Sequence, residues 1–208
     1  MTVHFEVLKA IAVPIAMDNV DTDQIFPSRF SSKDRADGKY GDYFLHDQRF
    51  DKNGQQNKDF ILNDVRYRGA KIIVASKNYA CGSARPGAIY SHLDYGICAI
   101  VSESFGSVFP TVAYKSGLLT IQVGKDTAQQ IRDALLCNPG SQIEIDLKDQ
   151  FISLENGQRF HFEIDHFIKT MFVEGVSEIN FTLKYSSKIA EFEAKLPHSF
   201  PWLYGKGR

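Results

Sequence analysis

The sequence contains few cysteines, and none of them are close together. Its 208 residues include only Cys81, Cys98 and Cys137, which lack the close pairing typical of zinc sites and of sites that bind iron–sulfur clusters. A small, odd number of cysteines also argues against a disulfide scaffold. We therefore expect this chain to hold no metal or cofactor of its own.

The sequence also lacks long apolar runs and an excess of one charge. Residues 11–17 are apolar but interrupted by Pro14, whereas a membrane helix needs about 20 apolar residues. The N-terminal part lacks a secretory signal pattern, which together with the cysteine usage predicts a cytoplasmic protein. With 24 Lys+Arg and 25 Asp+Glu the formal net charge is -1. We thus expect no nucleic-acid or membrane partner, but a small molecule or a protein.

The composition is that of a globular protein with a real core. Hydrophobic residues make up 43% of the chain and charged residues 24%, which are ordinary fractions for such proteins. A chain of this length stays below the roughly 250–300 residues at which single cores stop growing. We predict one domain over residues 1–208.

The middle of the chain alternates strand-like and helix-like patterns. The predicted strands are 71–75, 97–101 and 118–123, and the predicted helices are 88–93, 104–115 and 127–136. Such alternation favours parallel strands with covering helices. Residues 143–164 instead alternate apolar and polar positions around Asn156-Gly157, which is typical of a hairpin with a two-residue turn. The predicted fold is α/β, with a mostly parallel central sheet, antiparallel additions and flanking helices.

Two segments outside this pattern are polar or irregular in composition. Residues 28–58 are rich in polar residues and glycine, and loops of that length are usually functional or mobile. We expect part of this segment to close over a ligand. Residues 165–175 and 187–195 are predicted helices, and the end from Pro197 is predicted to be irregular.

The segment 78–87 lies between a buried strand and the start of a helix. Its small residues let backbone approach a ligand, and the first turn of a helix offers unpaired N–H groups to an anion. Arg85 can bind a carboxylate through two parallel hydrogen bonds, and Ser83 brings a hydroxyl close to that charge. Pro86 suits the first helical position. A small-acid site and a purely structural turn both remain open on these residues.

Other polar residues are interpreted more plainly. Asp18, Asp21 and Asp23 are interpreted as acids that cap a loop, and His161 and His166 as structural or surface residues. The chain has no phosphate loop and no G-x-G-x-x-G fingerprint, which disfavours a nucleotide-binding domain. A non-catalytic interaction module remains a further alternative.

Several spaced motifs resemble one family. They are Asp21-Thr22-Asp23-Gln24-Ile25, Asn78 to Arg85, Leu93-Asp94-Tyr95-Gly96, Asn138-Pro139-Gly140 and Ile189 to Lys195. Together they resemble the small subunit of 3-isopropylmalate dehydratase, nearly end to end. The resemblance implies the fold of the swivelling C-terminal domain of aconitase.

The resemblance also implies an activity and a partner. Members of this family are lyases of leucine biosynthesis that convert 2-isopropylmalate into 3-isopropylmalate by removing water and adding it back. They work as heterodimers, in which the large subunit carries a 4Fe–4S cluster that draws off the leaving hydroxyl as a Lewis acid. The implied ligand is a small hydroxydicarboxylate.

Site residues are implied by the same resemblance. Ser83 corresponds to the catalytic base and Arg85 to the residue that binds a substrate carboxylate. The remaining implied or expected substrate-binding residues are Gly82 and Ala84 in the turn, Arg29 and Arg35 in the long loop, and Asp21 and Thr22 at its mouth. For the loop arginines, a solvated basic loop is the alternative.

The chain departs from the family pattern beside the predicted base. Family members commonly have Cys-Gly-Ser-Ser-Arg-Glu-His-Ala, whereas this chain has Ala84, Pro86 and Gly87 in place of the second Ser, the Glu and the His. Two alternatives follow. The chain is the small subunit of a related hydro-lyase for a citramalate-type or maleate-type substrate, or it is a partner module of reduced activity.

Overall fold

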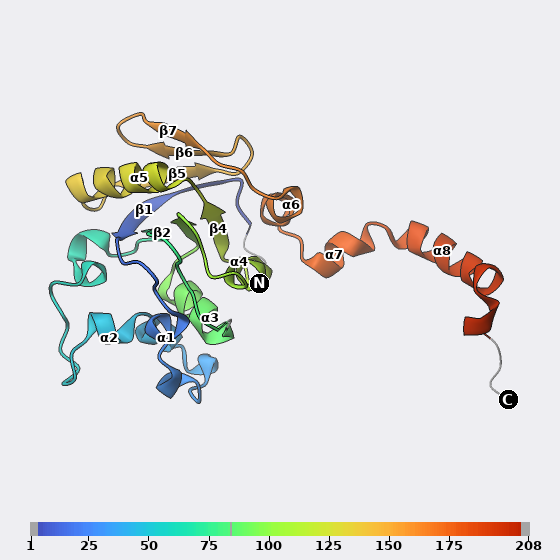
Figure 1. Cartoon of the computed structure of the whole chain (residues 1–208), viewed down its shortest axis with the longest axis horizontal. Coiled ribbons are helices and arrows are strands. Elements are labelled where there is room, and N and C mark those ends of the chain that lie inside the picture. Colours follow the sequence, from blue (N-terminus) through green and yellow to red (C-terminus); the bar gives the residue numbers. More distant parts are fainter. Residues whose placement is uncertain (1–3, 84, 205–208) are drawn as a thin grey trace. The chain divides into compact units, whose positions relative to one another are not determined.

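The computed structural model describes residues 4–83 and 85–204 (Figure 1). It divides into two compact units, Met1–Gly175 and Val176–Arg208, which are described separately below. The prediction of a single domain over residues 1–208 stays a prediction, because internal compactness does not show whether a segment folds independently.

The first unit is built on one seven-stranded sheet in the order β4-β3-β2-β1-β5-β6-β7. The strands are β1 (Val7–Ile15), β2 (Ile72–Ala75), β3 (Ala99–Ser102), β4 (Leu119–Gln122), β5 (Gln142–Asp146), β6 (Phe151–Leu154) and β7 (Arg159–His161). Strands β1 to β4 pair in parallel, and β5 to β7 add antiparallel strands beside β1. The predicted α/β fold class is confirmed.

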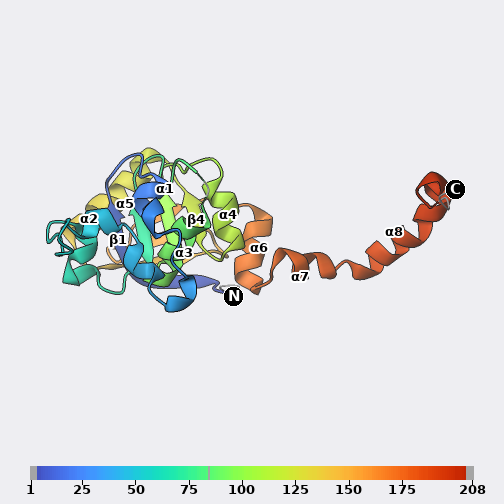
Figure 2. The same cartoon turned by 90° about the horizontal axis from the view of Figure 1, so that it is seen from below.

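Helices cover both faces of this sheet (Figures 1 and 2). They are α3 (Pro86–Tyr95), α4 (Phe109–Lys115), α5 (Lys125–Cys137) and α6 (His166–Glu174). On one face Ile73 belongs to a core with residues of α3 and α4, whereas Ile72 on the other face belongs to a core with residues of α5 and α6. Neighbouring strand residues point to opposite faces, so an all-apolar β2 is buried on both sides.

Between β1 and β2 the chain forms a layer of short helical turns. They are α1 (Thr22–Ile25), η1 (Ser28–Phe30), η2 (Arg35–Asp37), η3 (Tyr40–Tyr43), α2 (His46–Arg49), η4 (Ile61–Asn63) and η5 (Val65–Tyr67). The layer buries Phe26, Tyr40, Phe44 and Leu45 against the α3 side of the sheet. The segment predicted as a long polar loop therefore contributes part of the core.

The predicted hairpin around Asn156-Gly157 forms, but its two-residue turn is wrong. The backbone N–H of Leu154 donates to the carbonyl of Gln158 at 2.9 Å, which leaves three residues between the paired positions. Gly157 has a φ of +87°, the left-handed geometry that three-residue hairpin loops place at a glycine. The region also contains a third strand, because β5 pairs with β6 through a separate turn.

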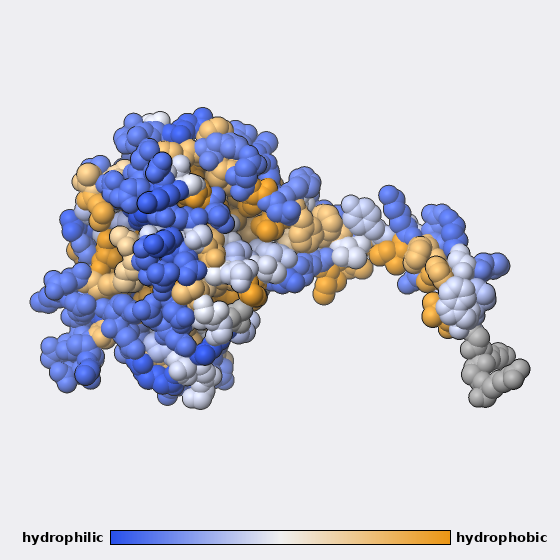
Figure 3. Space-filling model, viewed as in Figure 1, coloured by the Kyte–Doolittle hydropathy of each residue, from blue (hydrophilic) through white to orange (hydrophobic). Residues whose placement is uncertain are grey.

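The second unit consists of α7 (Glu178–Leu183), α8 (Ser186–Ser199) and η6 (Pro201–Leu203). The end predicted as irregular from Pro197 is thus helical up to Ser199. Figure 3 shows apolar side chains along this unit, where the exposed large hydrophobics are Ile179, Leu183, Tyr185, Ile189, Phe192, Phe200, Trp202, Leu203 and Tyr204. Across residues 4–83 and 85–204, the structure contains no helix whose length and apolar character suit a membrane span.

Candidate active site

The segments that follow β1, β2 and β3 meet at the carboxyl edge of the parallel strands. The turn of residues 76–85 lies in the middle, where Thr22 N donates to Cys81 O at 2.9 Å and Cys81 N donates to Val20 O at 3.2 Å. On the other side, Tyr79 N donates to Ser104 O at 3.0 Å. Ligands of open α/β sheets bind at this edge, so the fold places the predicted turn where a ligand site is expected.

The turn requires unusual backbone geometry. Asn78 and Ala80 both have a φ of +55°, and Gly82 has a φ of +87°. A Cβ atom on Gly82 would lie 2.3 Å from Asp21 Oδ2. Glycine suits this position because it tolerates positive φ and leaves room for the Asp21 carboxylate, which a side chain here would displace.

Ser83 and Arg85 lie at the exposed end of this turn. Ser83 is exposed, and within residues 4–83 and 85–204 its hydroxyl has no hydrogen-bond partner. Arg85 is the N-cap residue of α3 and its backbone N–H donates to Ser83 O at 2.9 Å. Arg85 Nη1 donates to Asp23 Oδ1. The predicted site residue Ala84 lies outside the described residues.

The three N-terminal aspartates have distinct partners. Asp21 caps α1 and forms a capping box with Gln24, as its interpretation as a capping acid predicts. Asp18 accepts a hydrogen bond from Ser76, and this bond, together with nearby Lys77, holds the pKa of the Asp18 carboxyl below its usual value. Asp23 is the partner of Arg85. Sequence reasoning missed this role because 62 positions separate the two residues.

Thr22 lies beneath this surface. The residue is 1% exposed, and its Oγ1 is buried without a hydrogen-bond partner in the described part of the chain. Its backbone N–H holds the turn through Cys81. The contribution of Thr22 is therefore structural in this arrangement, and its assignment to substrate binding stays a prediction.

A buried pair fastens the turn to α3. Tyr79 Oη lies 2.9 Å from His92 Nε2, and His92 Nδ1 lies 2.6 Å from the carbonyl oxygen of Ala88. Since a carbonyl only accepts, Nδ1 carries the hydrogen and Nε2 accepts from the tyrosine. Burial lowers the pKa of His92 to about 4. Neither residue was singled out from the sequence, where a lone histidine in a helix carries no signal of this pairing.

Phe26 occupies the space beside Gly87. A Cβ atom on Gly87 would lie 2.7 Å from Cδ1 of the Phe26 ring, and Phe26 is only 2% exposed. The histidine that family members commonly carry at this position has no room while Phe26 keeps this place. Gly87 therefore leaves the space beside the start of α3 that the Phe26 ring fills.

The structure does not bring Arg35 to the turn. Its Nε and Nη2 both donate to the carboxylate of Asp94 at 2.7 Å, and its guanidinium stacks over Tyr90. Asp94 lies nine residues after Arg85 along α3, a distance of about 13 Å at 1.5 Å per residue. Arg35 therefore binds the opposite end of the helix.

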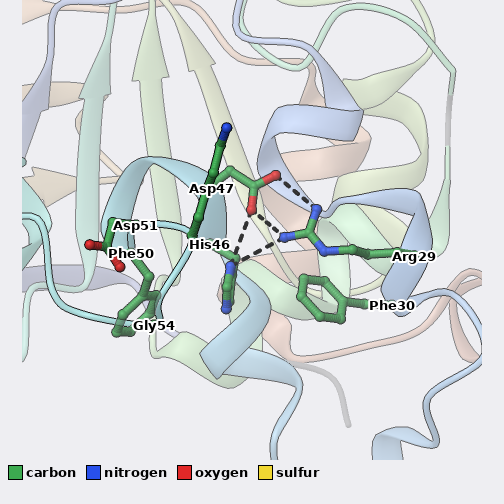
Figure 4. A pocket seen from close by; sticks show the side chains of 8 residues that line it. Arg29, Phe30, His46, Asp47, Phe50, Asp51 and Gly54 are labelled. Atoms are coloured by element: carbon green, nitrogen blue, oxygen red, sulfur yellow. Dashed lines mark hydrogen bonds and ion pairs between the residues drawn. The ribbon is translucent and has the colours of Figure 1, made fainter.

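Arg29 lines a separate cleft of about 800 Å³ (Figure 4). Its guanidinium forms an ion pair with Asp47 and lies 3.4 Å from His46 Nδ1. The cleft is also lined by Phe30, Phe50, Asp51, Lys52 and Gly54, whereas Ser83 and Arg85 do not line it. Substrate binding by Arg29 or Arg35 stays a prediction, and both side chains already have carboxylate partners.

Known proteins resemble this chain over most of its length. Residues 2–126 match the family model of the aconitase C-terminal domain, and residues 129–166 match the model described as LeuD_N. Two relatives named 3-isopropylmalate dehydratase small subunit, from Leptospira interrogans and Nitrosomonas eutropha, are 36% and 37% identical. Each match covers 96% of this chain and 98% of the relative.

A solved structure shares the fold. It is described as 3-isopropylmalate dehydratase from Methanocaldococcus jannaschii, with a TM-score of 0.63, 22% sequence identity, and coverage of 89% of this chain and 98% of that chain. The matched family model and the near full-length relatives show that this chain belongs to the family of 3-isopropylmalate dehydratase small subunits, within the group that shares the aconitase C-terminal domain.

Proposed function

We propose that this chain is the small subunit of a 3-isopropylmalate dehydratase, which interconverts 2-isopropylmalate and 3-isopropylmalate in leucine biosynthesis. The observation that carries the proposal is the turn at the carboxyl edge of the sheet. It presents an exposed Ser83 hydroxyl two residues before a guanidinium that is held by Asp23. The near full-length relatives with this name support it.

Ser83 is the proposed base and Arg85 the proposed carboxylate anchor. The proton to be removed lies next to a carboxylate and is weakly acidic, so the base must be stronger than a neutral hydroxyl. The positive charge of Arg85, two residues along the chain, favours the alkoxide form of Ser83. Asp23 bonds only Nη1 of Arg85 among the described contacts, which leaves the other edge of the guanidinium for a substrate carboxylate.

A large partner subunit is part of the proposal. The relatives are named small subunits, and the helices α7 and α8 expose apolar side chains such as Leu183, Ile189 and Phe192. Exposed apolar patches of this kind mark protein interfaces. We place the 4Fe–4S cluster on that partner, as the family resemblance of the chain implies.

A second substrate is favoured by one observation. Phe26 packs against Gly87 and fills the space of a side chain that family members commonly carry beside the base. A changed wall at the start of α3 is compatible with another small hydroxydicarboxylate, of the citramalate or maleate type. The reaction, removal and addition of water, is the same in both cases.

The proposal is tested by reconstitution. The chain is co-expressed with the large subunit from the same genome, purified anaerobically, and assayed with 2-isopropylmalate, citramalate and maleate in parallel. We expect turnover of 2-isopropylmalate by the pair and none by either subunit alone. Turnover by this chain alone, or an iron-loaded complex inactive on every hydroxydicarboxylate, would contradict the proposal. Preference for citramalate or maleate would select the second substrate.

A further inference from the structure

A buried ion pair lies below the candidate site without belonging to it. Arg132 of α5 and Glu103, which follows β3, have side chains only 4% and 10% exposed, with Nη2 and Oε1 at 2.8 Å. Buried ion pairs add little net stability, because the cost of removing two charges from water offsets their attraction. The pair therefore requires an explanation other than stability.

The guanidinium of Arg132 reaches the end of β2. Its Nη1 donates to the carbonyl of Ala75 at 2.6 Å, while Nη2 also donates to Gln129 Oε1 at 3.0 Å. Ala75 is the last residue of β2, and the turn that carries Ser83 begins at the next residue. Arg132 thus holds the backbone from which the turn starts.

Hydrogen bonds beside the acid of the pair connect the neighbouring segments. Glu103 Oε1 lies 3.5 Å from Ser76 Oγ, and Ser76 gives its single hydroxyl hydrogen to Asp18, which follows β1. Ser102 Oγ lies 2.6 Å from the carbonyl oxygen of Ser76. One hydrogen-bond network therefore joins the ends of β1, β2 and β3. The guanidinium of Arg132 contributes to this network because its two terminal nitrogens donate to different segments.

We propose that Arg132 is a positioning residue for the reaction at Ser83. This inference rests on the proposed function. Arg132 fixes the end of β2 relative to the segment after β3. It thereby determines the position of the turn 76–85 and of the Ser83 that this turn carries. Errors of about 1 Å in the placement of reacting groups can reduce rates about 100-fold, so a network remote from the substrate affects turnover.

The test removes both charges together. The double substitution Arg132→Met with Glu103→Gln leaves no unpaired buried charge, so the fold is expected to survive. Arg159→Met is the matched control, since Arg159 is an exposed arginine on β7. Arg132→Lys keeps the charge but lacks the fork that reaches two acceptors at once.

Kinetics of the reconstituted pair give the first measurement. We expect the double variant to have a kcat lower than that of the wild type by about tenfold or more, with KM unchanged within about twofold. The kcat of Arg132→Lys should lie between that of the double variant and that of the wild type. The control should match the wild type. An unchanged kcat in the double variant, or full recovery with lysine, would overturn the inference.

Amide hydrogen exchange of the isolated chain gives a second measurement that needs no activity. The N–H groups of Asn78 and Tyr79 bond to Ser104 at 2.8 and 3.0 Å. We expect them to exchange about tenfold faster in the double variant while α3 is unaffected. A uniform increase would show a merely structural role. If the wild-type pair proves inactive, the proposed function fails, and exchange at these amides still decides whether Arg132 positions the turn.

Discussion

Arg85 and Asp23 form an ion pair that joins the cap of α3 to the first turn of α1. The two side chains remain 41% and 51% exposed, so the pair contributes little to stability. The ion pair instead orients Arg85, because it fixes one guanidinium nitrogen of a long, flexible side chain two residues after Ser83. In this chain the acid that orients Arg85 is Asp23 of α1. Family members commonly carry a glutamate directly after this arginine, at the position of Pro86.

Replacing Asp23 should weaken substrate binding more than turnover. In Asp23→Asn we expect KM to rise up to about fivefold, because an exposed ion pair is worth up to about 1 kcal/mol, with kcat little changed. Steady-state kinetics of the reconstituted pair measure both. Asp149→Asn, in the turn between β5 and β6, serves as the control. A lower KM in Asp23→Asn would mean that Asp23 competes with the substrate for Arg85.

Ser83→Ala should abolish turnover while substrate still binds. A general base contributes about 100-fold to 10,000-fold to rate, and the alanine leaves Arg85 and the backbone of the turn in place. Turnover and equilibrium binding of 2-isopropylmalate are measured with the pair. Ser187→Ala, at an exposed serine of α8, should be neutral. Near-normal turnover by Ser83→Ala would show that another group is the base.

Gly82→Ala should destabilise the protein more than the same substitution at Gly54, another glycine with positive φ. Gly54 has a φ of +76° with nothing within 4 Å of an added Cβ, whereas at Gly82 the added atom meets Asp21 Oδ2 at 2.3 Å. We expect Gly54→Ala to cost about 1 kcal/mol and Gly82→Ala at least about 2 kcal/mol. Thermal unfolding compares them, and equal shifts in Tm would contradict the predicted clash.

His92 should make the protein less stable in mild acid. Its pKa is about 4 in the folded chain, compared with about 6.5 when unfolded. The contribution of neutral His92 to the free energy of unfolding is therefore fully present above pH 6.5. It is lost as the pH falls towards 4, because the unfolded chain binds the proton at a higher pH than the folded chain does. At pH 5 the loss amounts to about 2 kcal/mol.

Urea unfolding at pH 7.5 and pH 5 measures this dependence. His92→Gln should lower stability at pH 7.5 and reduce its dependence on pH, whereas His161→Gln, at an exposed position on β7, should keep the wild-type dependence. The same pH dependence in wild type and His92→Gln would rule out His92 as the titrating group.

A charge on the apolar side of α8 should weaken assembly with the large subunit. Phe192 is 61% exposed, and burying a phenylalanine side chain contributes about 1.5–3 kcal/mol. We expect Phe192→Asp to raise the Kd of the complex about tenfold or more, measured by sedimentation. Ser187→Asp on the same helix is the control. Equal affinity of both variants for the partner would exclude this face from the interface.

The strands, helices and turn were predictable because their signals are local. Alternation of apolar segments indicated the parallel strands, and small residues with Pro86 marked the start of α3. The hairpin turn was predicted one residue too short, since Gly157 takes its left-handed conformation in a three-residue loop. The helical layer between β1 and β2 escaped detection because each of its turns is only three or four residues long.

The sequence by itself determined the order of elements, the place of Ser83 and Arg85 between a strand and a helix, and the family resemblance. Only the tertiary structure decided their partners, because Asp23 meets Arg85 and Arg132 meets Glu103 across long separations in the chain. Burial and ion pairing depend on which segments the sheet brings together. For that reason Arg35 binds Asp94 at the far end of α3, although the family resemblance suggested a place for it at the substrate.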